Sequence, residues 1–235
     1  MAQVSELRST AKNDVGLTQA LSDIKLFQTH RFANTYRDLL TSIDYGDCTN
    51  FFLHELYSAR DYSERDAQFA RIGKALELTF PDQVVATAVT LAHLHRVTEE
   101  LDLAMAAHWH RRPNLPATTR YVHAWRAVGQ PDKRDWQLET VLRLGQALGE
   151  LTGKPGLRMM LKMMRQPARL AGLGTLQVFL ETGFDRFGML ARKRNAVDTF
   201  LNIIRTREAT WIEQLYHARM TDIDKSLSDL KPTMP

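Results

Sequence analysis

The sequence has few of the features that mark secreted, metal-clustered or membrane-spanning proteins. Cys48 is the only cysteine among the 235 residues, which excludes an intrachain disulfide, a zinc-finger framework and a four-cysteine cluster. The first 14 residues are polar and lack the apolar core of a secretory signal. No apolar run approaches the roughly 20 residues that a membrane-spanning helix needs. We therefore expect a soluble protein that works in a reducing cytoplasm.

The motifs of common enzyme classes are also missing. The sequence contains no G-x-G-x-x-G, Walker A, G-x-S-x-G or H-E-x-x-H pattern. Nucleotide hydrolysis is disfavoured for a second reason, since the short expected loops leave little room to cradle phosphates. Hydrophobic residues make up 44% of the chain and charged residues 25%, which is the composition of an ordinary globular protein. We expect a binding role rather than catalysis and assign no catalytic residue.

Alternating strand patterns are almost absent, and apolar residues recur instead at the three-to-four spacing of helices. This periodicity predicts an all-α bundle of about eight or nine helices without a significant sheet. The first is expected as one long helix over 17–44, which Tyr45-Gly46-Asp47 would end. Further helices are expected over about 50–57, 63–76, 82–110, 118–128, 132–152, 155–167, 176–187 and 197–215.

Composition and charge suggest how the chain is organised. We expect a single domain over 15–221, with mobile ends at 1–14 and 222–235 and a sub-boundary near 111–118. Residues 1–110 hold 10 basic and 15 acidic side chains, whereas residues 111–235 hold 21 and 12. The net charges of −5 and +9 indicate either two complementary faces of one domain or a C-terminal half that meets an anionic partner.

One segment resembles a family of uncharacterised proteobacterial all-α proteins. The resemblance lies in Phe51-Phe52-Leu53 followed by Glu55-Leu56-Tyr57, and in the ten residues RDYSERDAQF from Arg60. Leu94-His95, the run from Glu99 to Asp102, and Thr206-Arg207-Glu208 are similar to that family too. The resemblance implies a bacterial cytoplasmic origin and brings no activity with it.

The expected helix over 82–110 carries a polar stripe. The apolar stripe of residues 84–91 continues at His95, Glu99 and Asp102, which fall within an arc of roughly 60° at about 100° per residue. An imidazole and two carboxylates on one face can bind a divalent metal or orient a general base. A seven-residue register through Leu94 would instead leave the three side chains on a solvated flank. The stripe is therefore either a metal site or a plain surface.

Haem is a further alternative for the same region. Three more histidines, His93, His108 and His110, lie on the long helix, and one of them could serve as an axial ligand against an apolar pocket. The aromatic residues that could line such a pocket are Phe51, Phe52, Phe69 and Trp109. Aromatics at helical spacing are also what an ordinary core requires, so this pattern leaves both interpretations open.

Glu208 interrupts the apolar stripe that Phe200, Ile204, Trp211 and Leu215 form on the expected helix over 197–215. A buried carboxylate is costly unless it is paired, so Glu208 requires a basic or hydrogen-bonding partner. The candidates in the sequence are Arg205 and Arg207, which could fold back to fix the helix register.

A basic, methionine-rich segment follows Gly153. No acidic residue occurs between Glu150 and Glu181, and four methionines are interleaved with the cations. The cations are Lys154, Arg158, Lys162, Arg165 and Arg169. Such a basic amphipathic helix can contact an acidic protein, an anionic ligand or a membrane surface. Alternatively, its methionines face the core and its cations form a solvated back.

These patterns together predict a helical binding or regulatory protein of the cytoplasm that contacts a partner or ligand through its basic C-terminal half. Nucleic acid is disfavoured as the partner, because no helix-turn-helix surrounds the basic segment and no aromatic side chain interrupts its charges. The alternative is a metal- or haem-dependent helical enzyme or sensor that uses His95, Glu99 and Asp102.

Overall fold

Every regular element in the described part of the chain is a helix. The computed structural model describes residues 14–55, 63–72 and 77–228. Twelve helices and no strand are found in these ranges. They are α2 (Val15–Thr35), α3 (Arg37–Leu40), α4 (Gly46–Glu55), α5 (Ser63–Arg71), α7 (Asp82–His110), α8 (Ala117–Val128), α9 (Pro131–Thr152), α10 (Leu157–Met163), α11 (Arg165–Leu170), α12 (Gly174–Ala191), α13 (Ala196–His217) and α14 (Met220–Ser228). The predicted all-α fold is confirmed.

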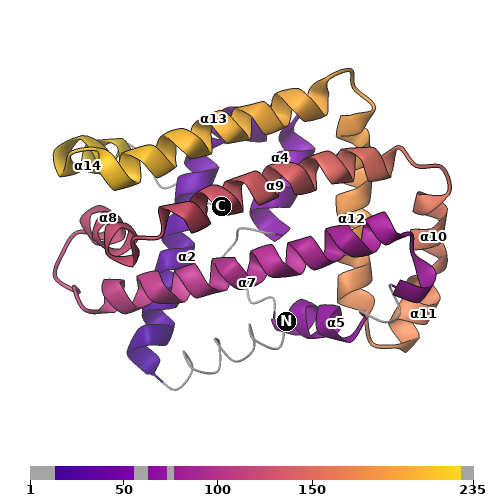
Figure 1. Ribbon diagram of the computed structural model, residues 1–235, viewed down its shortest axis with the longest axis horizontal. Coiled ribbons are helices and arrows are strands. Elements are labelled where there is room, and N and C mark those ends of the chain that lie inside the picture. The colour runs from indigo at the N-terminus through magenta and orange to yellow at the C-terminus, as the bar shows by residue number, and fades with distance from the viewer. Residues whose placement is uncertain (1–13, 56–62, 73–76, 229–235) are drawn as a thin grey trace.

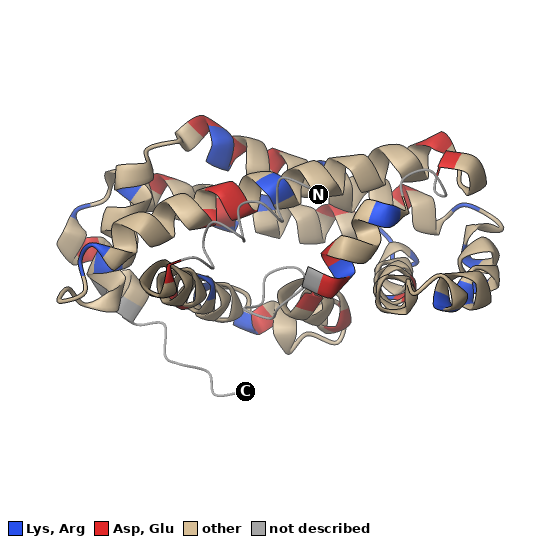
Figure 2. Ribbon diagram, turned by 90° about the horizontal axis from the view of Figure 1, so that it is seen from below, with Lys and Arg blue, Asp and Glu red and all other residues tan. Residues whose placement is uncertain are grey.

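The helices form two crossed layers. The long helices α7, α9 and α13 run side by side along the molecule, and α2 and α12 cross behind them (Figure 1). Helix α4 packs against both α2 and α12. Helix α8 lies at one end, and α10 and α11 lie at the other; Figure 2 shows the same arrangement from below. Helices from both sides of the 111–118 loop pack together, because α7 contacts α8 and α9.

The core consists of two clusters of buried side chains. The first surrounds α8 and includes the fully buried Met105, Tyr121 and Leu215. The second lies between α4, α9, α12 and α13 and includes Phe187 and Phe200. Burying each of these large side chains contributes about 1.5–3 kcal/mol relative to an exposed position. The candidate site described below lies where these two clusters meet.

Several helix boundaries follow local signals in the sequence. Helix α7 spans the predicted 82–110 and begins after Pro81, a residue suited to a helix start. Gly129 ends α8 in a left-handed conformation, with φ of 56°, which glycine adopts without the steric penalty of a side chain. Asp14 caps α2, since its carboxylate accepts a hydrogen bond from the backbone N–H of Leu17 at 3.0 Å.

The first long helix is shorter than predicted. Helix α2 ends at Thr35, and Tyr36 leaves the helical conformation with φ of −112° and ψ of 20°. The single helix expected over 17–44 is therefore wrong. Gly46 begins α4 rather than ending the preceding helix. The Ser42 side chain stabilises the turn between α3 and α4, because its oxygen accepts hydrogen bonds from the backbone N–H groups of Asp44 and Tyr45.

Two predictions for the C-terminal half also need correction. The basic segment forms two short helices, α10 and α11, instead of one, with Met164 between them and Pro167 in the first turn of α11. Residues from 222 onward were expected to form a tail, yet α14 extends to Ser228. Ile223 and Leu227 are buried against the first core cluster, which explains why the chain stays helical there. The expected N-terminal tail lies outside the described residues, except for Asp14.

No helix within the described ranges is both long enough and apolar enough to cross a membrane.

Candidate functional site

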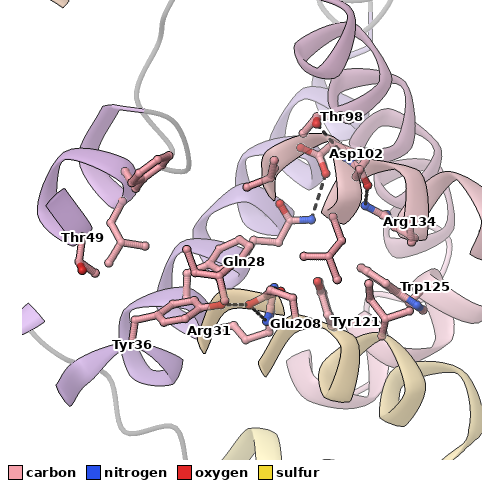
Figure 3. A pocket seen from close by; sticks show the side chains of 18 of the residues that line it. Gln28, Arg31, Tyr36, Thr49, Thr98, Asp102, Tyr121, Trp125, Arg134 and Glu208 are labelled. Atoms are coloured by element: carbon pink, nitrogen blue, oxygen red, sulfur yellow. Dashed lines mark hydrogen bonds and ion pairs between the residues drawn. The ribbon is translucent and has the colours of Figure 1, made fainter. Parts of the chain in front are cut away.

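A cavity of about 130 Å³ lies where the two core clusters meet. We call it the central cavity. Its wall is built by six helices, α2, α4, α7, α8, α9 and α13, together with Tyr36. The polar residues that line it are Gln28, Arg31, Tyr36, Thr49, Thr98, Asp102, Tyr121, Trp125, Arg134, Gln137 and Glu208 (Figure 3). The rest of the wall is apolar, formed by Phe32, Phe52, Leu53, Leu138, Val141, Phe200, Ile204 and Ile212.

A buried ion pair lies on one side of the central cavity. Arg31 donates two hydrogen bonds to Glu208, with Nη1 to Oε1 at 3.2 Å and Nη2 to Oε2 at 2.8 Å. Tyr36 donates a third hydrogen bond to Glu208 at 2.8 Å. Burial favours the neutral form of Arg31, but the charge and hydrogen bonds of Glu208, together with Tyr121 and Tyr36, outweigh this effect, so the pKa of Arg31 is raised. The charges of this pair are therefore matched within the protein.

The ion-pair partner of Glu208 differs from the two candidates that the sequence suggested. The Glu208 side chain is 13% exposed, and its ion-pair partner is Arg31 of α2. Arg205 and Arg207 instead pair at the surface with Glu139 and Asp38. Their positions next to Glu208 in the sequence therefore did not decide the pairing.

Asp102 lies on another wall of the cavity and is 3% exposed. Gln28 donates a hydrogen bond to its Oδ1 at 3.0 Å. Burial raises the pKa of Asp102 and Glu99 adds to this effect, whereas Lys25, Arg134 and the Gln28 hydrogen bond act in the opposite direction. Asp102 therefore holds a negative charge less readily than an exposed aspartate does.

Arg134 is a buried cation in a different situation from Arg31. Its guanidinium donates to Gln137 Oε1 at 3.0 Å and to the sulfur of Met105 at 3.1 Å. It also lies 4.0 Å from the centre of the Trp125 ring, a cation–π contact. No carboxylate of the described residues forms an ion pair with it. Burial lowers the pKa of Arg134, although Asp102 partly opposes the shift.

Several buried donors around the cavity have no hydrogen-bond partner among the described residues. They include the Tyr121 hydroxyl and the Trp125 indole N–H, together with Nε of Arg31. Tyr121 is completely buried, and burial raises its pKa. A buried donor without a partner costs about 1–3 kcal/mol.

The three residues of the predicted polar stripe lie on the same helix but have different partners. His95 Nε2 lies 2.9 Å from Asp66 Oδ2 of α5, and the Lys25 ammonium donates to Glu99 at 2.6 Å. Asp102 alone lines the central cavity. No group of three or more histidine, cysteine, aspartate or glutamate side chains in the described ranges is arranged to hold a metal ion. The three predicted site residues therefore interact with side chains of α5 and α2 instead of with one shared ligand position.

Packing explains this outcome. The seven-residue seam is buried, as Leu94, Leu101 and Met105 show, yet Glu99 and Asp102 are buried as well. Both patterns hold at once because α2 and α9 cover α7 from two directions.

The residues considered for haem do not surround one space. Among the described residues that line the central cavity there is no histidine. His93 is exposed, and its ring packs against Trp136 at 4.8 Å. Phe52 lines the cavity, Phe51 packs against Phe179, and Trp109 belongs to the first core cluster.

The predicted basic residues lie on and beside α10 and α11, at the end of the molecule opposite α8 (Figure 1). Arg158 pairs with Asp185 and Arg165 pairs with Glu181, both acids of α12. Lys154 donates to Gln83. Lys162 and Arg169 are exposed, and no described carboxylate forms an ion pair with either. The segment is therefore partly neutralised by its neighbours.

The sequence analysis missed Arg31, Tyr121 and Arg134. Arg31 had a usable signal, since it follows the buried Ile24 by seven residues and so shares its helix face. A cation on one apolar stripe and Glu208 on another form a complementary pair. Arg134 carries no such signal, because an arginine in the first turn of a helix is usually solvated.

The fold and the central cavity define an all-α protein with a partly enclosed cavity in its core, polar on some walls and apolar on others. The chain belongs to the family described as Domain of unknown function (DUF8198), whose model matches residues 7–222. The resemblance to an uncharacterised helical family is thereby confirmed. No match was found among curated proteins or among solved structures.

Proposed function

We propose that this protein binds a small organic molecule in the central cavity. The carrying observation is the cavity itself: about 130 Å³ of space in the middle of the bundle, with an apolar wall and a few convergent polar groups. Binding sites for small molecules have this composition. A cavity of roughly 150 Å³ is known to accept benzene, so the central cavity suits a ligand of that order of size.

A variant that fills the cavity tests this proposal. Val141 lines the cavity from α9, and the larger side chain of Val141→Phe occupies part of its space. We expect fluorinated benzene-sized fragments to bind the unmodified protein and to bind Val141→Phe at least tenfold more weakly. Fluorine NMR line broadening in a titration measures both affinities. Leu138→Phe, which fills the same cavity from another position on α9, serves if Val141→Phe does not fold.

The matched control is Val178→Phe. Val178 is 64% exposed and lies on α12, outside the cavity lining. This variant should bind the fragments as the unmodified protein does. Equal binding by Val141→Phe, or no fragment binding to the unmodified protein at millimolar concentration, would contradict the proposal.

A second observation favours a surface role for the basic segment. Met159 and Met163 lie four residues apart on one face of α10 and are 62% and 71% exposed. Lys162 and Arg169 are exposed nearby. We propose that this surface binds an acidic protein segment that also carries apolar side chains. The adaptable methionines, and the cations that form no ion pair within the described residues, support an acidic protein as the partner.

Charge reversal tests the surface role. Lys162→Glu combined with Arg169→Glu should weaken binding of a helical glutamate- and leucine-rich peptide at least tenfold, and added salt should weaken it as well. Fluorescence anisotropy of the labelled peptide provides the measurement. The charge-matched control is Arg192→Glu with Arg194→Glu, two exposed cations of the loop between α12 and α13 that form no ion pair with a described carboxylate. Equal weakening in the control, or preferential binding to phosphatidylserine vesicles, would argue against an acidic protein partner.

The compartment and origin are also proposals. The single cysteine supports a reducing cytoplasm, and its thiol is buried. Burial, with a contribution from Asp47, raises the pKa of Cys48 to about 12. The resemblance in the segments around Phe51 and Arg60 supports a bacterial source.

A further inference from the structure

The buried groups of the central cavity that lack partners are all donors. Four buried side-chain atoms in the described ranges have no hydrogen-bond partner, and each is an N–H or O–H group: Nε of Arg31, Nε of Arg120, the Tyr121 hydroxyl and Nε1 of Trp125. Three of them belong to residues that line the cavity. No carboxylate or amide oxygen is among them. A ligand with acceptor atoms can satisfy all three of these groups, whereas a ligand with donors alone can satisfy only the Tyr121 hydroxyl.

The charges of the two arginines that line the cavity also favour a ligand with acceptor atoms. Arg31 is neutralised by the two-point contact with Glu208, and Glu208 is further satisfied by Tyr36. The groups that Arg134 contacts in the described chain are neutral: the Gln137 amide, the Met105 thioether, the Trp125 ring and the Tyr216 hydroxyl. A buried cation that lacks an ion pair is costly, and an entering anion reduces that cost.

Asp102 does not remove the need for an anion. It is close enough to Arg134 for each to affect the other's charge state. The two residues nevertheless form no ion pair, and Asp102 accepts its hydrogen bond from Gln28 instead. Asp102, Arg134 and Tyr121 all line the central cavity (Figure 3).

We propose that the ligand is a small monocarboxylic acid, whose carboxylate accepts hydrogen bonds from Arg134 and Tyr121 while its hydrocarbon part packs against the apolar wall. This proposal rests on the proposed function of the cavity and names its ligand class. Arginine presents paired donors that match the two oxygens of a carboxylate, and it holds its charge even when buried. The apolar part contacts Phe32, Phe52, Val141, Phe200 and Ile204.

Three probes of the same size separate the ligand classes. Benzoate is an anion, benzyl alcohol is neutral and benzylamine is a cation. Isothermal titration of the unmodified full chain at neutral pH should show benzoate binding at least tenfold more tightly than benzyl alcohol, with benzylamine the weakest. Because all three fit a benzene-sized space, the order reports the charge that the cavity selects.

Variants then assign the binding residues. Arg134→Gln should weaken benzoate binding at least tenfold and leave benzyl alcohol binding unchanged, because only the charged contact is lost. Tyr121→Phe removes one hydroxyl that has no partner in the described chain, so it should fold normally and weaken benzoate binding severalfold. The matched control is Arg143→Gln, an exposed arginine on the same helix as Arg134. It should leave benzoate binding unchanged.

The possible failures are distinguishable. Benzyl alcohol binding as tightly as benzoate would overturn the acid class while the cavity stays a binding site. Preferential binding of benzylamine would overturn it in favour of a cationic ligand held by Asp102. If Arg134→Gln does not fold, the order of the three probes and the Tyr121→Phe variant still decide the question. Absence of binding by all three probes overturns the acid class, and absence of binding by the fluorinated fragments as well overturns the proposed function.

Discussion

Replacing Glu208 with Gln should lower the free energy of unfolding by about 3–5 kcal/mol, because removal of one partner of a buried ion pair leaves the other charge uncompensated. Arg31 is only 4% exposed and directs two hydrogen bonds to Glu208. The neutral amide of glutamine can accept only part of this network and carries no charge. Urea unfolding followed by far-UV circular dichroism measures the difference.

The control for this change lies on the same helix. Glu213→Gln alters an exposed carboxylate whose neighbour His217 is exposed too, so it should change the free energy of unfolding by less than about 0.5 kcal/mol. A loss below about 1 kcal/mol for Glu208→Gln would mean that Arg31 does not depend on Glu208 for its charge.

Replacing Phe200 with Ala should lower the free energy of unfolding by about 3–5 kcal/mol, the range observed when a large aromatic side chain is removed from a core. Phe200 is 1% exposed and its ring packs against those of Tyr45 and Phe52, with centroids 5.9 and 6.0 Å apart. The exposed Ile43→Ala serves as the control and should change stability by less than about 0.5 kcal/mol.

Phe200 also lines the central cavity, so its removal has a second expected result. The enlarged space should admit a two-ring ligand such as fluorinated naphthalene, which the unmodified protein should bind at least tenfold more weakly. Fluorine NMR titration of both proteins tests this. A destabilised variant that gains no affinity for the larger ligand would show that the space at Phe200 collapses or does not join the cavity.

The composition of the chain and its local signals determined the fold class. The helical spacing of apolar residues, Pro81 before α7 and Gly129 after α8 act within one turn of the backbone, so they can be read without knowledge of the neighbours. The same local reasoning failed at Tyr36 and at Ile223. At Tyr36 the helix ends and the hydroxyl contacts Glu208, 172 residues away; at Ile223 burial against the first core cluster extends the helical structure.

The candidate site was predictable only in part. From its position on an apolar stripe, Glu208 was predicted to need a partner, but its partner Arg31 lies 177 residues away in sequence. The stripe of His95, Glu99 and Asp102 was visible as a helix face. The partners of these three residues, Asp66, Lys25 and Gln28 respectively, depended on which helices pack around α7.

Sequence by itself determined that this chain forms helices, where α7, α8, α9 and α13 begin and end to within two residues, and that Glu208 needs a partner. These properties depend on residues a few positions apart. Tertiary structure alone decided that Arg134 is a buried cation, and that neither an ion-pair partner for Arg134 nor a hydrogen-bond partner for the Tyr121 hydroxyl lies among the described residues beside the cavity. The physical reason is that burial and pairing arise between six helices brought together by packing, and no spacing along the chain encodes their relative positions.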